Sequence, residues 1–378
     1  MEIIKRDPVK FGIAFLVLAA VNVAGWYLFI TWKRPLGEPL NLSTSTPVEN
    51  TIEVSTETPF HTESVTEEPD FTPTPSTPTA TFTPEFTPTL EPVCGGPAYM
   101  TILVSGVAAE DYLYGLADAI RVVRVDFINQ KVAILALPRD MWVDIPVSIP
   151  QKTSGVTPGK LNQAYFYGTE GMGYYSGPGR GSGSLAETLQ NNFGLRVDHY
   201  ITGNLYSFRN TIDALGGINV CFADNVYKKR MDPDSGYEYP VTYIKAGCHT
   251  IDGEQAEFAV RQRIQIGDEG RITRQTVVLK AIAAKMLTPE GLKALPDLVN
   301  RLKTYFLLDL SPAEISQLLC LAGKIDREED ISYATIPDNM LTPQWVMDEV
   351  RGAYTYVYVP DKEAITELLV DFQQGTWP

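Results

Sequence analysis

The sequence is poor in the residues from which hydrolytic and zinc sites are usually built. Its 378 residues include three histidines, His61, His199 and His249, and no His-Glu-x-x-His run. The zinc-protease signature is therefore absent, and no set of nucleophile, histidine and acid is evident. The four cysteines form no Cys-x-x-Cys pair, which argues against a zinc site.

Basic residues are missing from Pro35 to Val93, where Thr, Ser and Pro dominate. Such a segment cannot bury enough apolar surface to offset its ordering entropy, so residues 33–93 are predicted to form a disordered stalk. Its repeated Thr-Pro steps favour a stiff, polyproline-like conformation. The stalk also carries most of the net charge of −15, so the rest of the chain is only mildly acidic.

Residues 11–32 are almost wholly apolar. This run matches the roughly 20 residues that cross a bilayer, and it exceeds the roughly 7–15 residues of a signal-peptide core. It is predicted to be a retained transmembrane anchor preceded by a short cytoplasmic tail, residues 1–10. Basic residues flank it on both sides, so the positive-inside rule does not decide its orientation.

The four cysteines all lie beyond the predicted anchor. An even number in an exported domain predicts two disulfides. Cys221 with Cys248 is the favoured pair because both flank one insertion, which leaves Cys94 with Cys320; four free thiols are the other interpretation. Stalk, anchor and disulfides together predict a single-pass protein of the cell membrane whose residues 94–378 are extracytoplasmic.

Residues 94–378 mix strand and helix patterns in one domain. β-rich runs occupy 100–106, 120–127 and 131–137, the last two joined as a hairpin at Asn129-Gln130. Helices are predicted at 184–193 and 206–215, each followed by glycine. Further strands are expected at 197–201, 218–222, 332–336 and 354–359, with helices through 252–324 and at the C-terminus. This order predicts an α/β protein, a three-layer α/β/α sandwich with a mixed, partly antiparallel central sheet.

Arginines gather in the stretch from Asp252 to Gln275 of this acidic chain. Asp252 and Gln255 form a capping-box pattern that starts a helix, and Asp268 is expected to cap a second helix, on which residues 271 and 275 share a face. Guanidinium groups bind phosphate oxygens two at a time, so the pattern indicates a diphosphate site. Structural ion pairs are the other interpretation. The cationic and polar candidates are Arg261, Arg263, Arg271, Arg274 and Gln275.

Three further segments could add to such a site. Arg139 and Asp140 follow Pro138 at the end of a predicted strand, where open α/β sheets bind ligands. Asp118 offers a carboxylate for a hard cation, and Lys160 adds a positive charge. The Gly-rich stretch 171–184 matches neither a P-loop nor a dinucleotide fingerprint, and we interpret it as a surface loop leading into a helix.

Taken in order, these motifs resemble those of LytR-CpsA-Psr (LCP) proteins from about residue 98 onward. The motifs are Pro138-Arg-Asp140, Lys160-Leu-Asn-Gln-Ala-Tyr165, Val197-Asp-His-Tyr200, Asp213-Ala-Leu-Gly-Gly217 and Asp252-Gly-Glu-Gln-Ala256 through Gln275. The resemblance implies a phosphotransferase, dependent on Mg²⁺ or Mn²⁺, at the outer face of a bacterial membrane. Its substrate would be a glycopolymer on a polyprenyl diphosphate carrier, its acceptor peptidoglycan, and pyrophosphatase activity on the carrier a possible second reaction.

The resemblance also assigns roles to residues. Asp118 becomes the metal ligand and Asp268 the acid beside the acceptor hydroxyl; Arg139, Lys160, Arg261, Arg263, Arg271 and Gln275 become the diphosphate ligands. Two positions depart from the family pattern: Ala108 stands where an aspartate is usual, and Leu116 where an arginine is usual. Glu110 or Asp111 could supply the missing carboxylate.

Two hypotheses follow. The first is a membrane-anchored transferase that uses Arg139, Arg261, Arg263 and Arg271 as its clamp. The second is a catalytically weak or inactive binder of polyprenyl-linked glycans, because Ala108 and Leu116 remove two functional groups. Nucleic-acid binding is disfavoured, since no basic surface stripe is visible.

Overall fold

The computed structural model describes residues 30–40, 42, 91–233, 235–262, 267–286, 288, 305–326 and 329–378, with the backbone alone for 267–269. The predicted tail, residues 1–10, lies outside the described residues, as do nearly all of the anchor, residues 11–32, and most of the stalk, residues 33–93. Among the helices that are described, none combines the length and the apolarity needed to cross a membrane.

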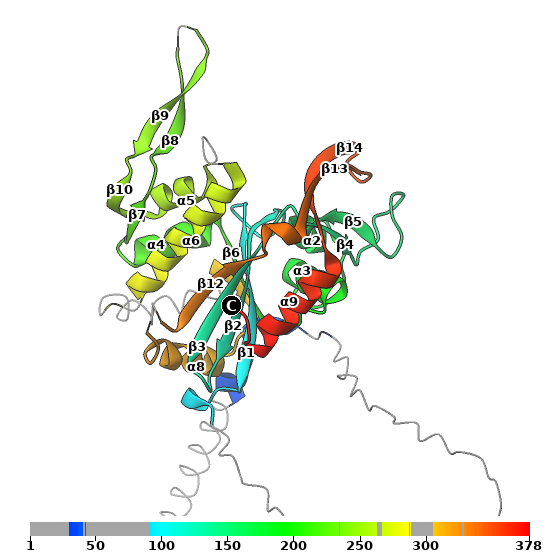
Figure 1. Ribbon diagram of the computed structural model, residues 1–378, viewed down its shortest axis with the longest axis vertical. Helices are drawn as coiled ribbons and strands as arrows, with labels where there is room; N and C mark the ends of the chain where they lie inside the picture. The colour runs from blue at the N-terminus through cyan, green and yellow to red at the C-terminus, as the bar shows by residue number, and fades with distance from the viewer. Residues whose placement is uncertain are drawn as a thin grey trace, which may run out of the picture. The chain divides into compact units, whose positions relative to one another are not determined.

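A six-stranded mixed sheet forms the centre of the fold (Figure 1). β1 and β3 both pair antiparallel with β2, whereas β6 runs parallel to β1 and β12 parallel to β3. In spatial order the strands are β11 (Phe306–Leu308), β6 (His199–Asn204), β1 (Tyr99–Val107), β2 (Ala117–Asp126), β3 (Lys131–Leu137) and β12 (Ile331–Thr335). The sheet is therefore mixed and partly antiparallel, as the sequence predicts.

Helices lie on both sides of this sheet (Figure 1). One face buries Leu103, Val122 and Leu135 against α2 (Leu161–Gly168), α3 (Arg180–Phe193) and α9 (Lys362–Gln374). The other side carries α4 (Leu205–Ala214), α5 (Gly253–Arg261), α6 (Gly267–Met286) and α8 (Pro312–Ala322). Asp252 caps α5 with Gln255 in the predicted capping box.

Within the described residues, four two-stranded ladders extend this framework. They pair β4 (Trp142–Ile145) with β5 (Thr157–Lys160), β7 (Ile218–Phe222) with β10 (Gly247–Ile251), β8 (Val226–Met231) with β9 (Glu238–Ile244), and β13 (Leu341–Asp348) with β14 (Ala353–Pro360). Short 3₁₀ turns occupy η1 (Val93–Gly95) and η2 (Asp338–Met340).

Helix α3 begins earlier than the sequence pattern predicts. The glycines that read as a loop lie inside its first turns and let it pack closely. A Cβ on Gly183 would come within 1.8 Å of the Pro178 carbonyl oxygen, and one on Gly181 within 2.9 Å of the Tyr165 ring. The predicted start at residue 184 is therefore wrong by four residues, while the end at Gly194, with φ of +67°, agrees.

Both disulfides have the pairing that the sequence favours. Cys94 of η1 is bonded to Cys320 of α8, and Cys221 is bonded to Cys248 at directly opposite positions of β7 and β10. The first bond ties together residues 226 apart in the sequence and the second residues 27 apart. The longer loop restricts the unfolded chain more.

Removing the Cys94–Cys320 bond should therefore cost more stability than removing Cys221–Cys248. Loop-closure entropy predicts a difference of about 2 kcal/mol between the double serine variants. Denaturant unfolding of both variants in the absence of reductant measures this difference. Equal losses would contradict an effect on the unfolded chain.

His199 is the first residue of β6 and contacts two carboxylates, one on α8 and one just before that helix. Its Nδ1 lies 3.5 Å from Asp309, and its Nε2 lies 3.4 Å from Glu314 on α8. Burial alone would lower the pKa of His199, but hydrogen bonding and charge from these carboxylates raise it to about 9. The imidazolium is thus the stable form at neutral pH.

The raised pKa gives a pH-dependent contribution to stability. It is fully present below the unfolded pKa of about 6.5 and is lost as the pH rises through about 9. Between pH 6.5 and 10 the free energy of unfolding should fall by up to about 3 kcal/mol. His199→Gln should remove most of this slope in denaturant titrations, whereas His249→Gln should keep it; identical slopes in all three proteins would refute this role.

Candidate functional site

Several predicted site residues meet at one edge of the central sheet. Because Ile120 pairs opposite Leu137, the start of β2 and the end of β3 lie side by side there. Asp118 belongs to β2, and Arg139 follows β3 by two residues. Lys160 ends β5 and directly precedes α2, where its backbone N–H donates to the Gln163 side chain at 2.6 Å.

Four charged side chains form an alternating chain across this edge. Arg139 Nη1 lies 2.6 Å from Asp118 Oδ1, and Arg139 Nε donates to Asp140 Oδ2 at 3.3 Å. Lys160 Nζ lies 2.7 Å from the other oxygen of Asp140. These side chains are between 12% and 28% exposed, so water screens their charges only in part. Each cation is held by a carboxylate whose place a phosphate oxygen can take.

Helix α6 adds a buried guanidinium. Arg271 is 3% exposed, and its Nη1 donates to the backbone carbonyl of Asp118 at 3.3 Å. Gln275, one turn later, donates to the carbonyl of Val260 at the end of α5. Of these two predicted ligands, Arg271 is therefore the one that the described contacts bring to Asp118.

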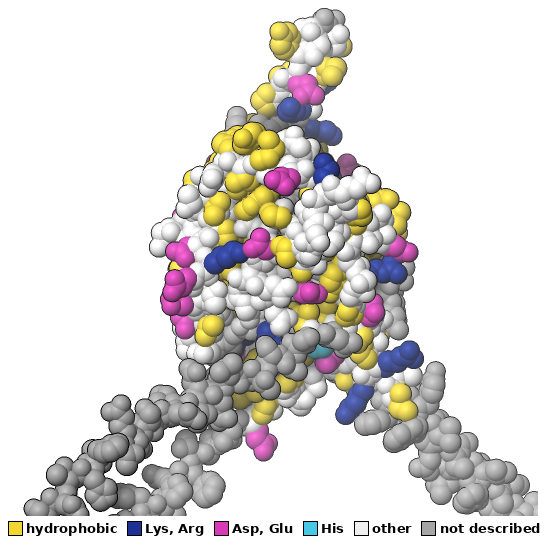
Figure 2. All heavy atoms as spheres, turned by 90° about the vertical axis from the view of Figure 1, so that its right-hand side faces the viewer, with side chains coloured by type: hydrophobic (Ala, Val, Ile, Leu, Met, Phe, Trp, Pro, Cys, Tyr) yellow, Lys and Arg dark blue, Asp and Glu magenta, His cyan; other side chains and the backbone are white. Residues whose placement is uncertain are grey.

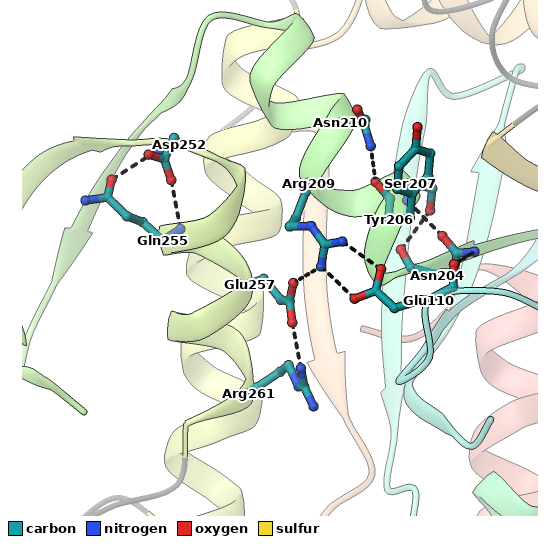
Figure 3. A network of polar contacts seen from close by, with 10 residues as sticks. All are labelled: Glu110, Asn204, Tyr206, Ser207, Arg209, Asn210, Asp252, Gln255, Glu257 and Arg261. Carbon is teal, nitrogen blue, oxygen red and sulfur yellow. Dashed lines mark hydrogen bonds and ion pairs between the residues drawn. The ribbon is translucent and has the colours of Figure 1, made fainter. Parts of the chain in front are cut away.

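Arg261 belongs to a second ion-pair network, drawn in Figure 3. Its Nη1 lies 2.6 Å from Glu257, which also pairs with Arg209. Arg209 forks onto both oxygens of Glu110 at 3.0 and 2.6 Å, and this hydrogen bonding lowers the pKa of Glu110. The side chain of Arg261 is 55% exposed and therefore lies on an accessible surface. Its described contacts do not include any of the four charged residues around Arg139.

The carboxylates proposed for a metal do not converge. Glu110 is held by Arg209, and Asp111 accepts the Leu113 N–H at 3.0 Å within its own loop. No group of three acids, histidines or cysteines surrounds a common point in the part of the chain that the structure describes. Asp118 does lie in the cluster, and its described side-chain contacts both reach Oδ1. One carboxylate suits Mg²⁺, which completes its shell with water and phosphate.

Three predicted residues remain. Arg263 lies outside the described residues, as does the side chain of Asp268, so their roles stay predictions. Arg274 is buried, donates to Gln262 at 3.1 Å and lies 5.9 Å from the Phe222 ring centre. It therefore joins α6 to its neighbours and does not reach the Asp118 edge.

Arg121 is a buried cation that the sequence interpretation missed. It is 5% exposed, its Nη1 donates to the neighbouring Ile120 carbonyl, and its Nη2 has no hydrogen-bond partner among the described residues. Burial, and secondarily the like charge of Arg271, lower its pKa to about 10, so it stays charged at neutral pH. The available signal was an arginine inside the apolar run of β2. An uncompensated buried charge is costly, and an anion would offset that cost.

Two hollows of the described structure lie away from this edge. One, of about 370 Å³, is lined by Tyr112, Tyr165 and Tyr200. The other, of about 680 Å³, lies beside His199 and Lys33. Neither Asp118 nor Arg139 lines either hollow. The sheet edge that carries these residues is therefore the better candidate for an anionic ligand.

The fold is therefore that of an α/β protein whose sheet carries guanidinium groups at one edge, where the chemistry suits an anion. The model of the LytR_cpsA_psr family matches residues 94–372, and the chain belongs to this family.

Individual relatives agree with this assignment. The chain is 28% identical over 239 residues to the regulatory protein MsrR of Staphylococcus aureus (strain COL), covering 63% of this chain and 64% of MsrR. It is 28% identical over 223 residues to TagU of Oceanobacillus iheyensis, a polyisoprenyl-teichoic acid–peptidoglycan teichoic acid transferase, covering 58% and 62%. The chain thus spans less than two thirds of either relative. The structure of Bacillus subtilis TagV has the same fold, with a TM-score of 0.54, 21% identity and coverage of 73% and 97%.

Arg121 should couple anion binding to stability. Arg121→Met removes an uncompensated charge and should leave the free energy of unfolding unchanged or higher. The same variant should lose most of the thermal stabilisation that inorganic pyrophosphate gives the wild-type protein. Thermal unfolding with and without pyrophosphate measures both effects.

Arg124 is the matched control on the same strand. It is also buried, but it pairs with Asp126 at 3.1 Å. Arg124→Met should therefore destabilise the protein by roughly 3 kcal/mol, since the buried Asp126 loses its cation and the Gln373 carbonyl loses its donor, and should keep the response to pyrophosphate. A full pyrophosphate response in Arg121→Met would exclude Arg121 from the anion site.

Proposed function

We propose that this protein transfers a glycopolymer from a polyprenyl diphosphate carrier to peptidoglycan, forming a phosphodiester. The observation that carries the proposal is the partly buried chain of Asp118, Arg139, Asp140 and Lys160, with Arg271 against its first member. Family membership and the activity for which TagU is named support the same reaction. We further propose that the domain lies outside the cell on the predicted anchor and stalk.

The cations of this cluster could release their carboxylate partners and bind a substrate phosphate instead. A diphosphate at this edge would take over the contacts that Arg139 and Lys160 make with Asp118 and Asp140. Arginine forks bind such oxygens in pairs, and the low exposure of the cluster strengthens the attraction. Arg271, which donates to the Asp118 carbonyl, and Arg121, three residues after Asp118 on β2, would add positive charge.

The chemical step would be a displacement at the phosphorus that bears the glycopolymer. A hydroxyl oxygen of the acceptor sugar forms the new P–O bond, and the bond to the bridging oxygen breaks so that polyprenyl phosphate leaves. Arg139 and Lys160 would stabilise the charge that develops on the leaving phosphate. The hydroxyl proton needs a base, a role that the family resemblance assigns to Asp268.

Asp118 would hold the metal through its carboxylate. A bound Mg²⁺ or Mn²⁺ would neutralise phosphate charge during the reaction. Once Arg139 turns to the substrate, the Asp118 carboxylate becomes available for this role.

A second candidate is a binder with little or no turnover. Ala108 and Leu116 stand where the family usually has an aspartate and an arginine, and Glu110 is occupied by Arg209. Binding of a diphosphate needs the cations alone, whereas transfer needs the metal site as well.

Arg139→Ala should reduce transfer from a polyprenyl diphosphate glycan by roughly 10²- to 10³-fold, because it removes a charge placed to stabilise the leaving group. Asp118→Ala should lose the transfer that divalent metal supports, because it removes the proposed metal ligand. The assay follows release of polyprenyl phosphate by the purified protein, with and without Mg²⁺.

Lys229→Ala is the control, since Lys229 forms an exposed ion pair with Glu238 on the β8–β9 ladder. It should retain full transfer. Tight binding by the wild-type protein without turnover in any divalent metal would support the binder instead. Full affinity in Arg139→Ala would refute both candidates.

A further inference from the structure

The β13–β14 ladder places its large aromatic and apolar side chains together on one face. Antiparallel register places Pro343 opposite Tyr358, Trp345 opposite Tyr356 and Met347 opposite Tyr354, and alternation along each strand puts all six on one face. The opposite face carries Val357, which is fully buried, and Thr355. We call the first set the outer face of the hairpin.

The outer face is exposed although it is apolar and aromatic. Trp345 is 65% exposed, Tyr354 67%, Met347 45% and Tyr356 41%. Figure 2 views the molecule from the side on which β13 and β14 lie in Figure 1, and hydrophobic side chains gather on its upper part. A contiguous patch of this kind on a soluble domain usually marks an interaction site.

The rings form a continuous row along the hairpin. Trp345 and Tyr356 have centroids 5.8 Å apart, and Tyr356 and Tyr358 have centroids 5.7 Å apart, in edge-on arrangements. From Pro343 to Met347 the row extends about 14 Å at the usual rise of a strand. No charged side chain belongs to these six positions.

The base of this row adjoins the cationic edge. The Tyr358 N–H donates to the carbonyl of Asp140 at 3.0 Å, and Tyr358 forms a bridge with Met141. Asp140 is the residue whose carboxylate holds both Arg139 and Lys160. The aromatic row therefore starts beside the diphosphate ligands and leads away from them.

The chemistry of the row fits sugar rings. Tyr and Trp offer large, rigid and largely apolar faces together with polar groups at their edges. A pyranose has matching properties, with C–H groups on its faces and hydroxyls around its rim. A chain of such rings leaving the diphosphate would pass along the row.

A membrane surface fits the row less well. Membrane-binding faces usually combine apolar side chains with Lys and Arg, which these six positions lack. The described N-terminal residues also approach the other end of the sheet, because Lys33 and Tyr99, the first residue of β1, line the same hollow.

We propose that the outer face of β13–β14 binds the first sugars of the glycopolymer whose diphosphate lies at Arg139 and Lys160. This inference rests on the proposed function and identifies the donor glycan, not the acceptor, as the occupant, because the row begins at the diphosphate ligands.

Two probes separate the hairpin from the cationic edge. One is a short prenyl diphosphate without sugar, and the other is the same diphosphate carrying a linear N-acetylhexosamine oligosaccharide. The wild-type protein should bind the sugar-bearing probe more tightly. Trp345→Ala and Tyr356→Ala should each raise its Kd about tenfold, the effect of losing one aromatic stacking contact. Both variants should leave the Kd of the sugar-free probe unchanged.

Tyr237→Ala is the matched control, because Tyr237 is 79% exposed beside the β8–β9 ladder and lies outside the row. It should bind both probes as the wild-type protein does. Thermal unfolding should show the same midpoint for all variants, and Tyr354→Ser provides a second exposed substitution in the row.

The failures are distinguishable. No binding of the sugar-free probe by the wild-type protein would overturn the proposed function. Equal affinity of the wild-type protein for both probes, or unchanged sugar affinity in the row variants, would overturn the hairpin inference alone. Loss of self-association, or of binding to phosphatidylglycerol vesicles, in variants with normal sugar affinity would reassign the row to a second copy or to a membrane.

Discussion

The ion pair between Asp118 and Arg139 depends on the antiparallel register of β2 and β3, and the candidate site depends on that pair. The register brings the first residues of one strand beside the last residues of the other, so residues 21 apart in the sequence meet with their charges 2.6 Å apart. Pro138 ends β3 at this point and directs the following residues across the edge. Asp140 then binds Lys160 and, through its carbonyl, the base of β14. One strand pairing thus places the cluster and the aromatic row together.

The same cluster shows how a protein can hold cations in position at a candidate anion site. Exposed guanidinium groups would remain hydrated, whereas burial without partners would cost stability. Here the acids hold Arg139 and Lys160 in position, so a diphosphate that replaced the acids would meet cations that are already oriented. Arg121 is different, because its Nη2 has no partner among the described residues, so a nearby anion would offset a charge that those residues leave uncompensated.

Local sequence signals predicted five of the six central strands, the capping box of α5, both disulfides and the edge at which Arg139 would lie; β11 lies where helices were expected. They failed where tertiary packing decides the outcome. The glycines of α3 read as a loop because close helix packing is invisible along one chain. The positions of Gln275 and Arg274 on α6 gave no indication that their partners would be Val260 and Gln262. β13 was missed because Pro343 lies within it, and an edge ladder tolerates a proline that a central strand would not.

The departures from the family pattern can be understood together. The usual arginine is replaced by Leu116, which is 37% exposed near the start of β2, while Arg121 carries its charge five residues later on the same segment and is almost fully buried. A buried charge such as that of Arg121 is surrounded by a lower dielectric than an exposed arginine at position 116 would be. Its field is therefore screened less, and it can attract an anion without itself binding the outer phosphate oxygens. That arrangement would preserve attraction for a diphosphate and leave its outer oxygens to Arg139, Lys160 and a metal at Asp118. Binding would then tolerate the missing arginine at Leu116, because electrostatic attraction adds over many charges. Catalysis would tolerate the missing carboxylate at Ala108 less well, because a metal needs ligands at fixed distances.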